Sequence, residues 1–342
     1  MDSSYASSDE SDSEFEYEIL RIPRQAFRLR RFIYDIPDDD AVTEFRFTIR
    51  EVRFMRLLLN IDDALECGNR LRCSGDEALL ILLSRLSSTK RTIDIARDFD
   101  RCPSSVSLIW TTLATFLHHR WAHIIRFNEG RVAANVGRYA AAILSRGAAL
   151  DNVWGFVDGT SREIARPVRD QRLFFDGHHH YHSIKFQAIV TPDGLISHLF
   201  GPVAGSRHDM FAFHMSALEQ TMSTPALDDY VVFGDRGYAT IGHLMSPIVR
   251  PMLTQDEASF NESMLIPRLS VEHGFMRITK LFRMFQAPSI LRSRSCPVAL
   301  FYELAVLFTN LRTCLDGRNQ ISDYFACEPC SCEELLGLNA AL

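Results

Sequence analysis

Three carboxylates stand where the chain can bring them together to bind divalent cations. Asp158 and Asp235 each end a short apolar run, FVD and FGD, that predicts a buried strand, and Glu272 lies on a predicted helix 37 residues after Asp235. Carboxylate oxygens are the ligands that Mg²⁺ and Mn²⁺ prefer. Two such ions about 3.5–4 Å apart activate a nucleophile and stabilise the leaving oxygen in phosphodiester cleavage. We therefore expect Asp158, Asp235 and Glu272 to be metal ligands and catalytic residues.

Spacing alone leaves a second interpretation open, because an Asp at a strand end often forms a turn or a helix cap. Glu272 is expected at the edge of an apolar helix stripe, close to Lys280 and Arg283, where the core meets a basic surface. Gly159 and Gly234, each beside an Asp, are expected to leave room for a bulky substrate. The stripe is made of Val271, Phe275, Ile278, Phe282 and Phe285.

The elements around these acids mix strands with helices. NVWGFVD and the two halves of residues 181–203, joined by a Pro192-Asp193-Gly194 turn, predict three consecutive strands. A helix in SRHDMFAFHMSAL follows, with Asp209 expected to cap it rather than to support the metal site, and then a short strand in DYVVFGDRG. RLSVEHGFMRITKLFRMF and VALFYELAVLFTNLRTCL predict two long helices. This order predicts an α/β layer fold over residues 151–325.

Residues 21–135 are expected to form an all-α region that enters a helix near Thr48. The segments GDEALLILLSRLSS, RTIDIARDFD and RCPSSVSLIWTTLATFL predict three helices, the first capped by Ser74 and the last entered through Pro103. A short helix, a tight turn and a longer helix are the plan of a helix-turn-helix motif. The third helix begins with three serines and has no Lys or Arg, so base reading and a purely structural role both stay open. The motif's packing positions hold Ile95, Ala96, Phe99, Val106 and Ile109.

Composition excludes several classes of protein. With 46% hydrophobic and 23% charged residues, the chain is neither fibrous nor largely disordered. The longest apolar run, Val298 to Leu311, contains Glu303 and is predicted to be too short to span a bilayer. The N-terminus lacks the basic start and apolar core of a secretory signal, so we expect an intracellular protein without membrane contact. Residues 1–20 carry seven acids and no basic side chain and are predicted to be a disordered tail.

Three further clusters have competing interpretations. The arginines between Arg21 and Arg31 suit a nuclear import patch, a DNA-binding arm or a solvated amphipathic segment. The run His178–His182 enters a strand, whose alternation would turn the imidazoles to both faces rather than onto one zinc ion. Cys327, Cys330 and Cys332 would need a fourth zinc ligand such as Cys314 or a His, and free thiols in a C-terminal tail, 326–342, are expected instead.

Several ordered motifs resemble the catalytic region of PIF/Harbinger-type transposases, which are DDE superfamily endonucleases. They are the run from Phe156 (FVDGTSREIA) to Phe213, then VVFGDRGY, RLSVEHGFMRITKLF and LFTNLRTCLDG, and together they extend over about residues 151–325. The upstream helices resemble the family's helix-turn-helix region more weakly. His208-Asp209 matches the family's HD pair, whereas HHHYH stands where relatives commonly have one His and a Lys or Arg.

The resemblance implies a ribonuclease H-like domain, a mixed sheet flanked by helices, with a metal-dependent triad at Asp158, Asp235 and Glu272. It further implies a two-metal site for Mg²⁺ or Mn²⁺, DNA phosphodiesters as substrate, and water or a 3′-hydroxyl as nucleophile. A nuclear location follows, with a separate Myb-like protein supplying part of the DNA recognition. A domesticated, non-catalytic DNA- or chromatin-binding protein is the main alternative. A hydrolase of small phosphoesters is a third, and homo-oligomerisation and the target sequence stay open.

Overall fold

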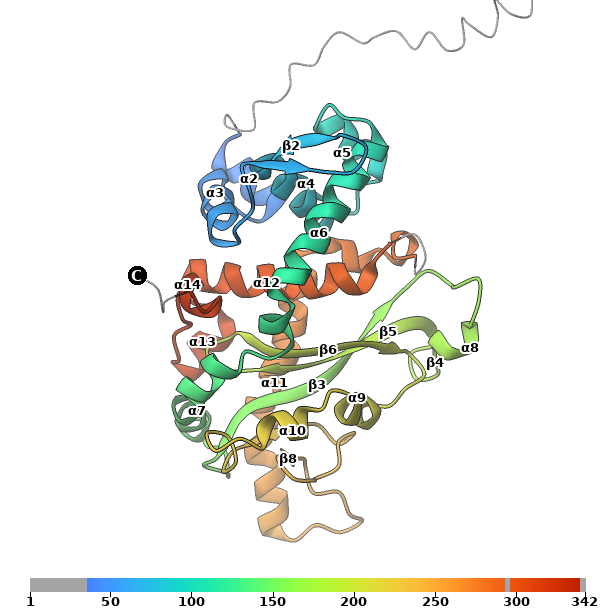
Figure 1. Ribbon diagram of the computed structural model, residues 1–342. Helices are drawn as coiled ribbons and strands as arrows, with labels where there is room; N and C mark the ends of the chain where they lie inside the picture. The colour runs from blue at the N-terminus through green and yellow to red at the C-terminus, as the bar shows by residue number, and fades with distance from the viewer. Residues whose placement is uncertain (1–35, 293–295, 339–342) are drawn as a thin grey trace, which may run out of the picture.

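The computed structural model describes residues 36–292 and 296–338. The predictions for residues 1–20 and for the arginines up to Arg31 lie outside the described residues. Figure 1 shows a helical N-terminal part stacked on a layer that contains a sheet, with one long helix, α12, lying between them. The chain has a mixed α/β fold in which helices flank a mixed sheet.

The N-terminal part is mainly helical, as the sequence predicts. Thr48 caps α3 through a capping box with Glu51, and the Ser74 hydroxyl accepts a hydrogen bond from the first turn of α4. The prediction of an all-α region was wrong, because the antiparallel strands β1 and β2 form a hairpin ahead of α4. The five helices described here are α2 (Asp38–Phe45), α3 (Ile49–Leu58), α4 (Gly75–Ser87), α5 (Thr92–Asp98) and α6 (Pro103–Arg126), and the hairpin strands are β1 (Ala64–Glu66) and β2 (Arg72–Ser74).

The helix α6 is longer than predicted, because its apolar periodicity continues beyond Leu117 through Trp121 to Ile125. It therefore carries two arginines in its last turns, Arg120 and Arg126, that the shorter predicted helix lacks. Four of the five predicted packing positions of the helix-turn-helix motif are buried, and Phe99 is partly buried against the same core.

The main sheet is built on β5, which pairs antiparallel with β3 on one side and with β6 on the other. The strand β7 runs parallel to β3, and β8 runs parallel to β7. The three predicted strands, the turn at Pro192-Asp193-Gly194 and the short strand before Asp235 are confirmed, but the three strands are not consecutive, because a short helix and the strand β4 lie between the first and the second. The strands are β3 (Val153–Glu163), β4 (Phe175–Asp176), β5 (Tyr181–Val190), β6 (Ile196–Ala204), β7 (Val231–Phe233) and β8 (Leu244–Met245).

Helices cover the sheet on both faces. Asp158 of β3 points toward α11, whereas a Cβ on the next residue, Gly159, would point at Asp209 of α9. Adjacent strand residues face opposite ways, so α11 and α9 lie on opposite faces of β3. All five residues of the stripe predicted around Glu272 are buried. The helices are α7 (Glu129–Leu144), α8 (Gln171–Phe174), α9 (Asp209–Met215), α10 (Leu218–Met222), α11 (Gln255–Leu281), η2 (Arg283–Gln286), η3 (Pro288–Ile290), α12 (Val298–Asp316), α13 (Gln320–Phe325) and α14 (Cys332–Leu335).

The helix α12 joins the two parts of the molecule. Its Tyr302 stacks on Phe186 of β5 with ring centroids 4.3 Å apart, and its Phe308 packs edge-on against Phe47 at 6.4 Å. Among the described residues it is the one helix that is long and apolar enough to cross a membrane, so the prediction from length was wrong: the helix runs on to Asp316. Most of α12 is buried inside the protein, as in the core helix of a soluble protein.

Two ion pairs, one buried and one partly buried, join helices to neighbouring elements. Arg131 of α7 is buried and donates to Asp193 Oδ2 at 2.8 Å, and the Tyr139 hydroxyl also contacts this carboxylate. Arg312 of α12 pairs in a bidentate way with Glu51 of α3, at 2.7 and 2.8 Å. Unpairing the buried Arg131–Asp193 pair would be costly, and the partly buried Arg312–Glu51 pair further restricts how the helices can shift.

Candidate active site

Asp158 lies on β3, and Asp235 follows two residues after the end of the neighbouring parallel strand β7. Phe156 of β3 is in register with Phe233 of β7, and each aspartate follows two residues later. These matching positions bring the two residues to the same edge of the sheet, where the charge of Asp235 acts on the Asp158 carboxyl. The sequence prediction that these two acids end neighbouring strands agrees with this register, although β3 itself continues to Glu163.

The Asp158 carboxyl is mostly buried, and 17% of its side chain is exposed. Burial, together with the nearby charges of Asp235 and Asp209, raises the pKa of Asp158 to about 7. The Gly159 amide donates to Asp158 Oδ1 at 2.7 Å and partly offsets this effect. Two neighbouring carboxylates that repel each other in a dry site are a suitable place for a cation.

Asp209 reaches the same acids from the other face of β3. The prediction that it caps its helix was wrong: His208 is the N-cap residue, and Asp209 is the first residue of α9 with no capping hydrogen bond. Burial raises the pKa of Asp209, the Lys185 ammonium opposes the rise, and the Asp235 charge adds to it. The sequence held a signal for this residue, the polar pair His208-Asp209 ahead of an apolar helix, but the cap interpretation obscured it.

The two glycines beside the acids make room for the protein's own side chains rather than for substrate. A Cβ at Gly159 would collide with Asp209 Oδ1, and one at Gly234 would lie 2.8 Å from the Tyr238 ring. Tyr238 is buried, its hydroxyl donates to Gln187 at 3.4 Å, and its pKa is raised well above the usual range by burial beside the three aspartates. Sequence reasoning missed Tyr238, since nothing local distinguishes it from a core aromatic residue.

Glu272 lies on α11 and shares an arginine with Asp158. Arg268, one helical turn earlier, donates to Glu272 Oε1 at 2.8 Å, and its other nitrogen lies 3.6 Å from Asp158 Oδ2. The Glu272 side chain is 48% exposed, whereas that of Arg268 is 14% exposed. The basic partner of Glu272 is thus Arg268, whereas the sequence predicted Lys280 and Arg283.

The donor chemistry fits a hard divalent cation. Asp158, Asp235 and Glu272 offer only carboxylate oxygens, and Arg268 shows that a positive group is accommodated between Asp158 and Glu272. Within residues 36–292 and 296–338, however, no group of three or more His, Cys, Asp or Glu side chains is arranged to hold a metal ion. Asp158 and Asp235 therefore lie close to each other, whereas the Glu272 carboxylate accepts a hydrogen bond from Arg268.

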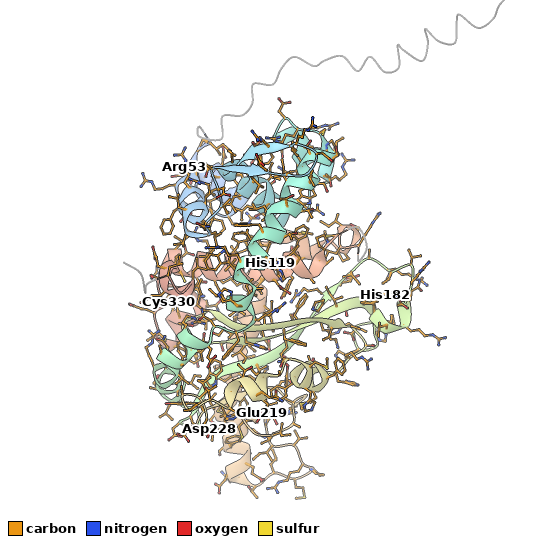
Figure 2. All side chains as sticks on the ribbon, viewed as in Figure 1. Arg53, His119, His182, Glu219, Asp228 and Cys330 are labelled. Atoms are coloured by element: carbon orange, nitrogen blue, oxygen red, sulfur yellow. The ribbon has the colours of Figure 1, made fainter. Side chains whose placement is uncertain are left out.

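The histidine run ends at His182, which lies on the opposite side of the molecule from Cys330, between α13 and α14 (Figure 2). His178, His179 and His180 form the turn between β4 and β5, and His182 of β5 pairs with Phe175 of β4. His179 Nδ1 lies 3.0 Å from the buried Asp176 carboxylate, and Lys185 Nζ lies 3.4 Å from it. Burial opposes ionisation of Asp176, but hydrogen bonds from His179 and Ser161 hold its pKa well below the usual range. This arrangement anchors the turn.

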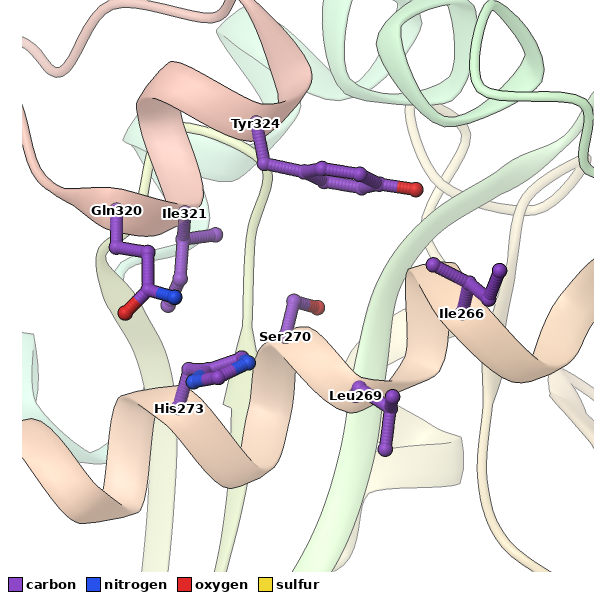
Figure 3. A pocket seen from close by; sticks show the side chains of 7 residues that line it. All are labelled: Ile266, Leu269, Ser270, His273, Gln320, Ile321 and Tyr324. Carbon is purple, nitrogen blue, oxygen red and sulfur yellow. The ribbon is translucent and has the colours of Figure 1, made fainter.

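A small cavity of about 120 Å³ lies between α11 and α13 (Figure 3). Ile266, Leu269, Ser270 and His273 line it from α11, and Gln320, Ile321 and Tyr324 line it from α13. None of the four acids borders it, although Leu269 and His273 directly follow Arg268 and Glu272 on the helix. The cavity belongs to the packing of the two helices and is separate from the acids.

Comparisons with known proteins give one finding on family. No curated protein and no solved structure matches the chain. The matched segment of the family model contains all four acids, together with Arg268 and Tyr238, and ends within α12. The family model that matches this chain, over residues 157–309, is that of the DDE superfamily endonucleases.

Proposed function

We propose that this chain is a metal-dependent DNA endonuclease or transposase of the PIF/Harbinger type, with Asp158, Asp235 and Glu272 as its catalytic acids. The observation that carries the proposal is the register of β3 and β7, which sets Asp158 and Asp235 side by side inside the segment that matches DDE superfamily endonucleases. The match suggests a transposase or nuclease and implies a DNA substrate.

We also propose that the sheet belongs to a ribonuclease H-like domain. Its support is the strand arrangement: three long antiparallel strands, β3, β5 and β6, followed by β7 and β8 parallel to the first of them. The N-terminal helices α4, α5 and α6 are proposed as a helix-turn-helix unit on their lengths and buried faces. Nuclear action and recruitment by a Myb-like DNA-binding partner belong to the same proposal and rest on the resemblance in sequence.

The carboxylates of Asp158, Asp235 and Glu272 would hold Mg²⁺ or Mn²⁺, which would activate a water or a 3′-hydroxyl and stabilise the leaving oxygen of the phosphodiester. In the described structure, the positive charge of Arg268 partly neutralises the negative charges of Asp158 and Glu272. Tyr238 is buried beside the three aspartates, whereas Asp235 is partly exposed and Glu272 is exposed, so we expect water to reach the acids from the side of Asp235 and Glu272. Asp209, held against Gly159, adds negative charge beside Asp235.

The test is a nicking assay on DNA that carries candidate element ends, the short terminal inverted repeats that would flank the gene. Wild type should cut with Mg²⁺ or Mn²⁺ and poorly with Ca²⁺, whose looser coordination holds the reacting oxygens less rigidly. Asp158→Asn, Asp235→Asn and Glu272→Gln should each lose cleavage by a factor of at least ~100. Asp151→Asn changes an exposed acid just before β3 and should cut like wild type.

Thermal melts with and without metal supply a readout that does not depend on activity. Metal should stabilise wild type and Asp151→Asn more than the three triad variants. Cleavage without metal, or full activity of Asp158→Asn, would remove this site from consideration.

A non-catalytic DNA- or chromatin-binding protein is the second candidate function. It is favoured by the Glu272–Arg268 contact, which occupies the third acid in the described structure. If wild type neither cuts DNA nor gains stability with Mg²⁺ or Mn²⁺, while still binding DNA, this second function takes the lead.

A further inference from the structure

The cysteines near the C-terminus belong to the packing of α14. The segment that carries them is not the loose tail predicted from the sequence, because Ser331 forms a capping box with Glu334 and α14 packs against α12. Cys327, Cys330 and Cys332 are free thiols, and Cys327 and Cys332 are buried. Their burial is explained by this packing.

A cavity of about 470 Å³ lies where the N-terminal helices meet the segment that leads into α12. Helices α4, α5 and α6 and the Arg91 N-cap supply one wall, and η3, the loop after it and the start of α12 supply the other. Arg85, Arg91 and Arg292 line the cavity together with hydroxyl side chains of α5, α6 and η3. None of the described lining residues is acidic, so the cavity is chemically suited to a negatively charged ligand.

Arg85, in the last turn of α4, is a buried positive charge without a negative partner. Only 7% of the residue is exposed, and its guanidinium carbon lies over the Trp110 ring, 5.1 Å from the centroid. Its Nη1 donates to the Lys90 carbonyl at 3.3 Å, whereas its buried Nε has no hydrogen-bond partner. In the part of the chain that the structure describes, no carboxylate forms an ion pair with Arg85. Burying an unpaired charge is costly, so an anion in the cavity would stabilise the protein.

The other two arginines of the cavity are exposed, and only one of them has an acidic partner. Arg91 forms a bidentate pair with Asp94, at 2.9 and 3.0 Å. Arg292 Nε donates to the Ser289 carbonyl at 3.2 Å, and Arg292 forms no ion pair with any residue that the structure describes. The positive charges of Arg85 and Arg292, on opposite walls of the cavity, are therefore uncompensated.

We propose that this cavity binds a phosphate group, carried by a DNA strand or by a nucleotide in solution, through Arg85 and Arg292. Each guanidinium offers a planar fork of N–H donors that matches phosphate oxygens. Ser107 and Thr111, one turn apart on α6, add hydroxyl donors to the lining. The cavity is a second site, separate from the acids, and only a DNA source for the phosphate rests on the proposed function.

The position of the two arginines favours phosphate over a carboxylate ligand. A phosphate group is tetrahedral and accepts hydrogen bonds from several directions, so arginines on opposite walls can both donate to it. A carboxylate has two oxygens in one plane and pairs best with a single guanidinium. Acetate is therefore the negative control for the ligand.

The first experiment titrates the full-length chain with inorganic phosphate at constant ionic strength, followed by thermal melting and calorimetry. Phosphate should raise the melting temperature of wild type, whereas acetate should not. Arg85→Met keeps the length of the side chain but removes its charge, and should bind phosphate at least ~10-fold more weakly. Arg292→Gln should also weaken binding. The matched control is Arg97→Gln, at an exposed arginine of α5 that does not line the cavity, and it should bind like wild type.

Competition identifies the source of the phosphate. If DNA supplies it, inorganic phosphate should compete with a short duplex at constant ionic strength, and Arg85→Met should lower the slope of log affinity against log salt by about 1. If a free nucleotide supplies it, AMP should bind more tightly than inorganic phosphate, and the slope for the duplex should be the same in wild type and variant. Both results support the phosphate site, and neither needs cleavage, so a failure of the proposed nuclease activity is distinguishable from a failure here.

Two results would overturn the proposal. One is a wild type that does not bind inorganic phosphate, and the other is equal binding by wild type, Arg85→Met and Arg292→Gln. Arg292 is exposed, so Arg292→Gln decides the question even if Arg85→Met folds poorly.

Discussion

At the scale of single residues, the charge of Asp158 depends on its surroundings more than on its own chemistry. Burial and the charges of Asp235 and Asp209 raise its pKa to about 7. An aspartate in an unfolded chain titrates near ~3.9. The folded protein therefore binds one more proton than the unfolded chain between these two pH values, and the free energy of unfolding falls as the pH rises through that window.

Asp158→Asn should remove this dependence. In metal-free buffer at pH 8, the variant should melt at a higher temperature than wild type, with a gain in the free energy of unfolding of at most ~4 kcal/mol. The advantage should shrink steadily between pH 7 and pH 4, where wild-type Asp158 becomes protonated. The measurement is a series of thermal melts with a chelator. A difference between the two proteins that does not change with pH would show that the Asp158 charge is not the cause.

Gly159 offers a second test at this scale. Gly159→Ala should destabilise the protein by ~1–3 kcal/mol, because the new methyl group displaces Asp209 from beside β3. Gly130→Ala is the matched control: a Cβ there meets nothing within 4 Å, and the residue lies in α7, where alanine is the better helix former. Urea unfolding of both variants gives the comparison. Equal stability of the two variants would contradict the packing of Asp209 against Gly159.

At the scale of elements, substitutions in α6 can distinguish a structural role of this helix from a role in reading DNA bases. Val106 is fully buried on α6, whereas Ser104 is exposed at its start. Val106→Asp should cost at least ~3 kcal/mol, because it buries an unpaired charge, and should unfold the N-terminal helices. Ser104→Ala should leave both the melting temperature and DNA affinity close to wild type. A sequence-selective loss of affinity in Ser104→Ala, with unchanged stability, would show that α6 reads bases.

Elements with a strong local signal could be predicted from the sequence, and elements defined by distant contacts could not. Thr48, Ser74 and the turn at Gly194 mark their helices and hairpin through their own chemistry. The β1–β2 hairpin has three-residue strands without clear alternation, and α14 gains its place from packing on α12. In the candidate site, Asp158 and Asp235 could be predicted because each ends an apolar run typical of a strand. The roles of Arg268 and Tyr238 could not be predicted, because they depend on contacts between distant elements.

At the scale of the whole molecule, charge is distributed very unevenly along the chain. The net charge is −6, yet residues 1–20 carry seven acids and no basic side chain, so the remainder has a net charge of +1. A polyanionic substrate and an acidic segment of the same chain would compete for one basic surface.

Deleting residues 1–20 should therefore tighten non-specific DNA binding and steepen its dependence on salt, because more phosphate contacts form when the acidic segment is gone. Titration of a duplex at several salt concentrations measures both quantities. A variant in which the acids of residues 1–20 become Asn or Gln controls for chain length. Unchanged affinity and slope in both proteins would contradict competition by this segment.

The pairing of β3 with β7 also determines how the chain can vary without losing its acids. One residue inserted into either strand would turn Asp158 or Asp235 to the opposite face, so their relation tolerates no change in length within the strands. Between β8 and α11, by contrast, the chain crosses the surface with Val249 and Met252 exposed, and doubling such a loop costs only ~0.6 kcal/mol. Distant relatives are thus free to differ widely in the number of residues between the second and third acids, while the first two stay in fixed register.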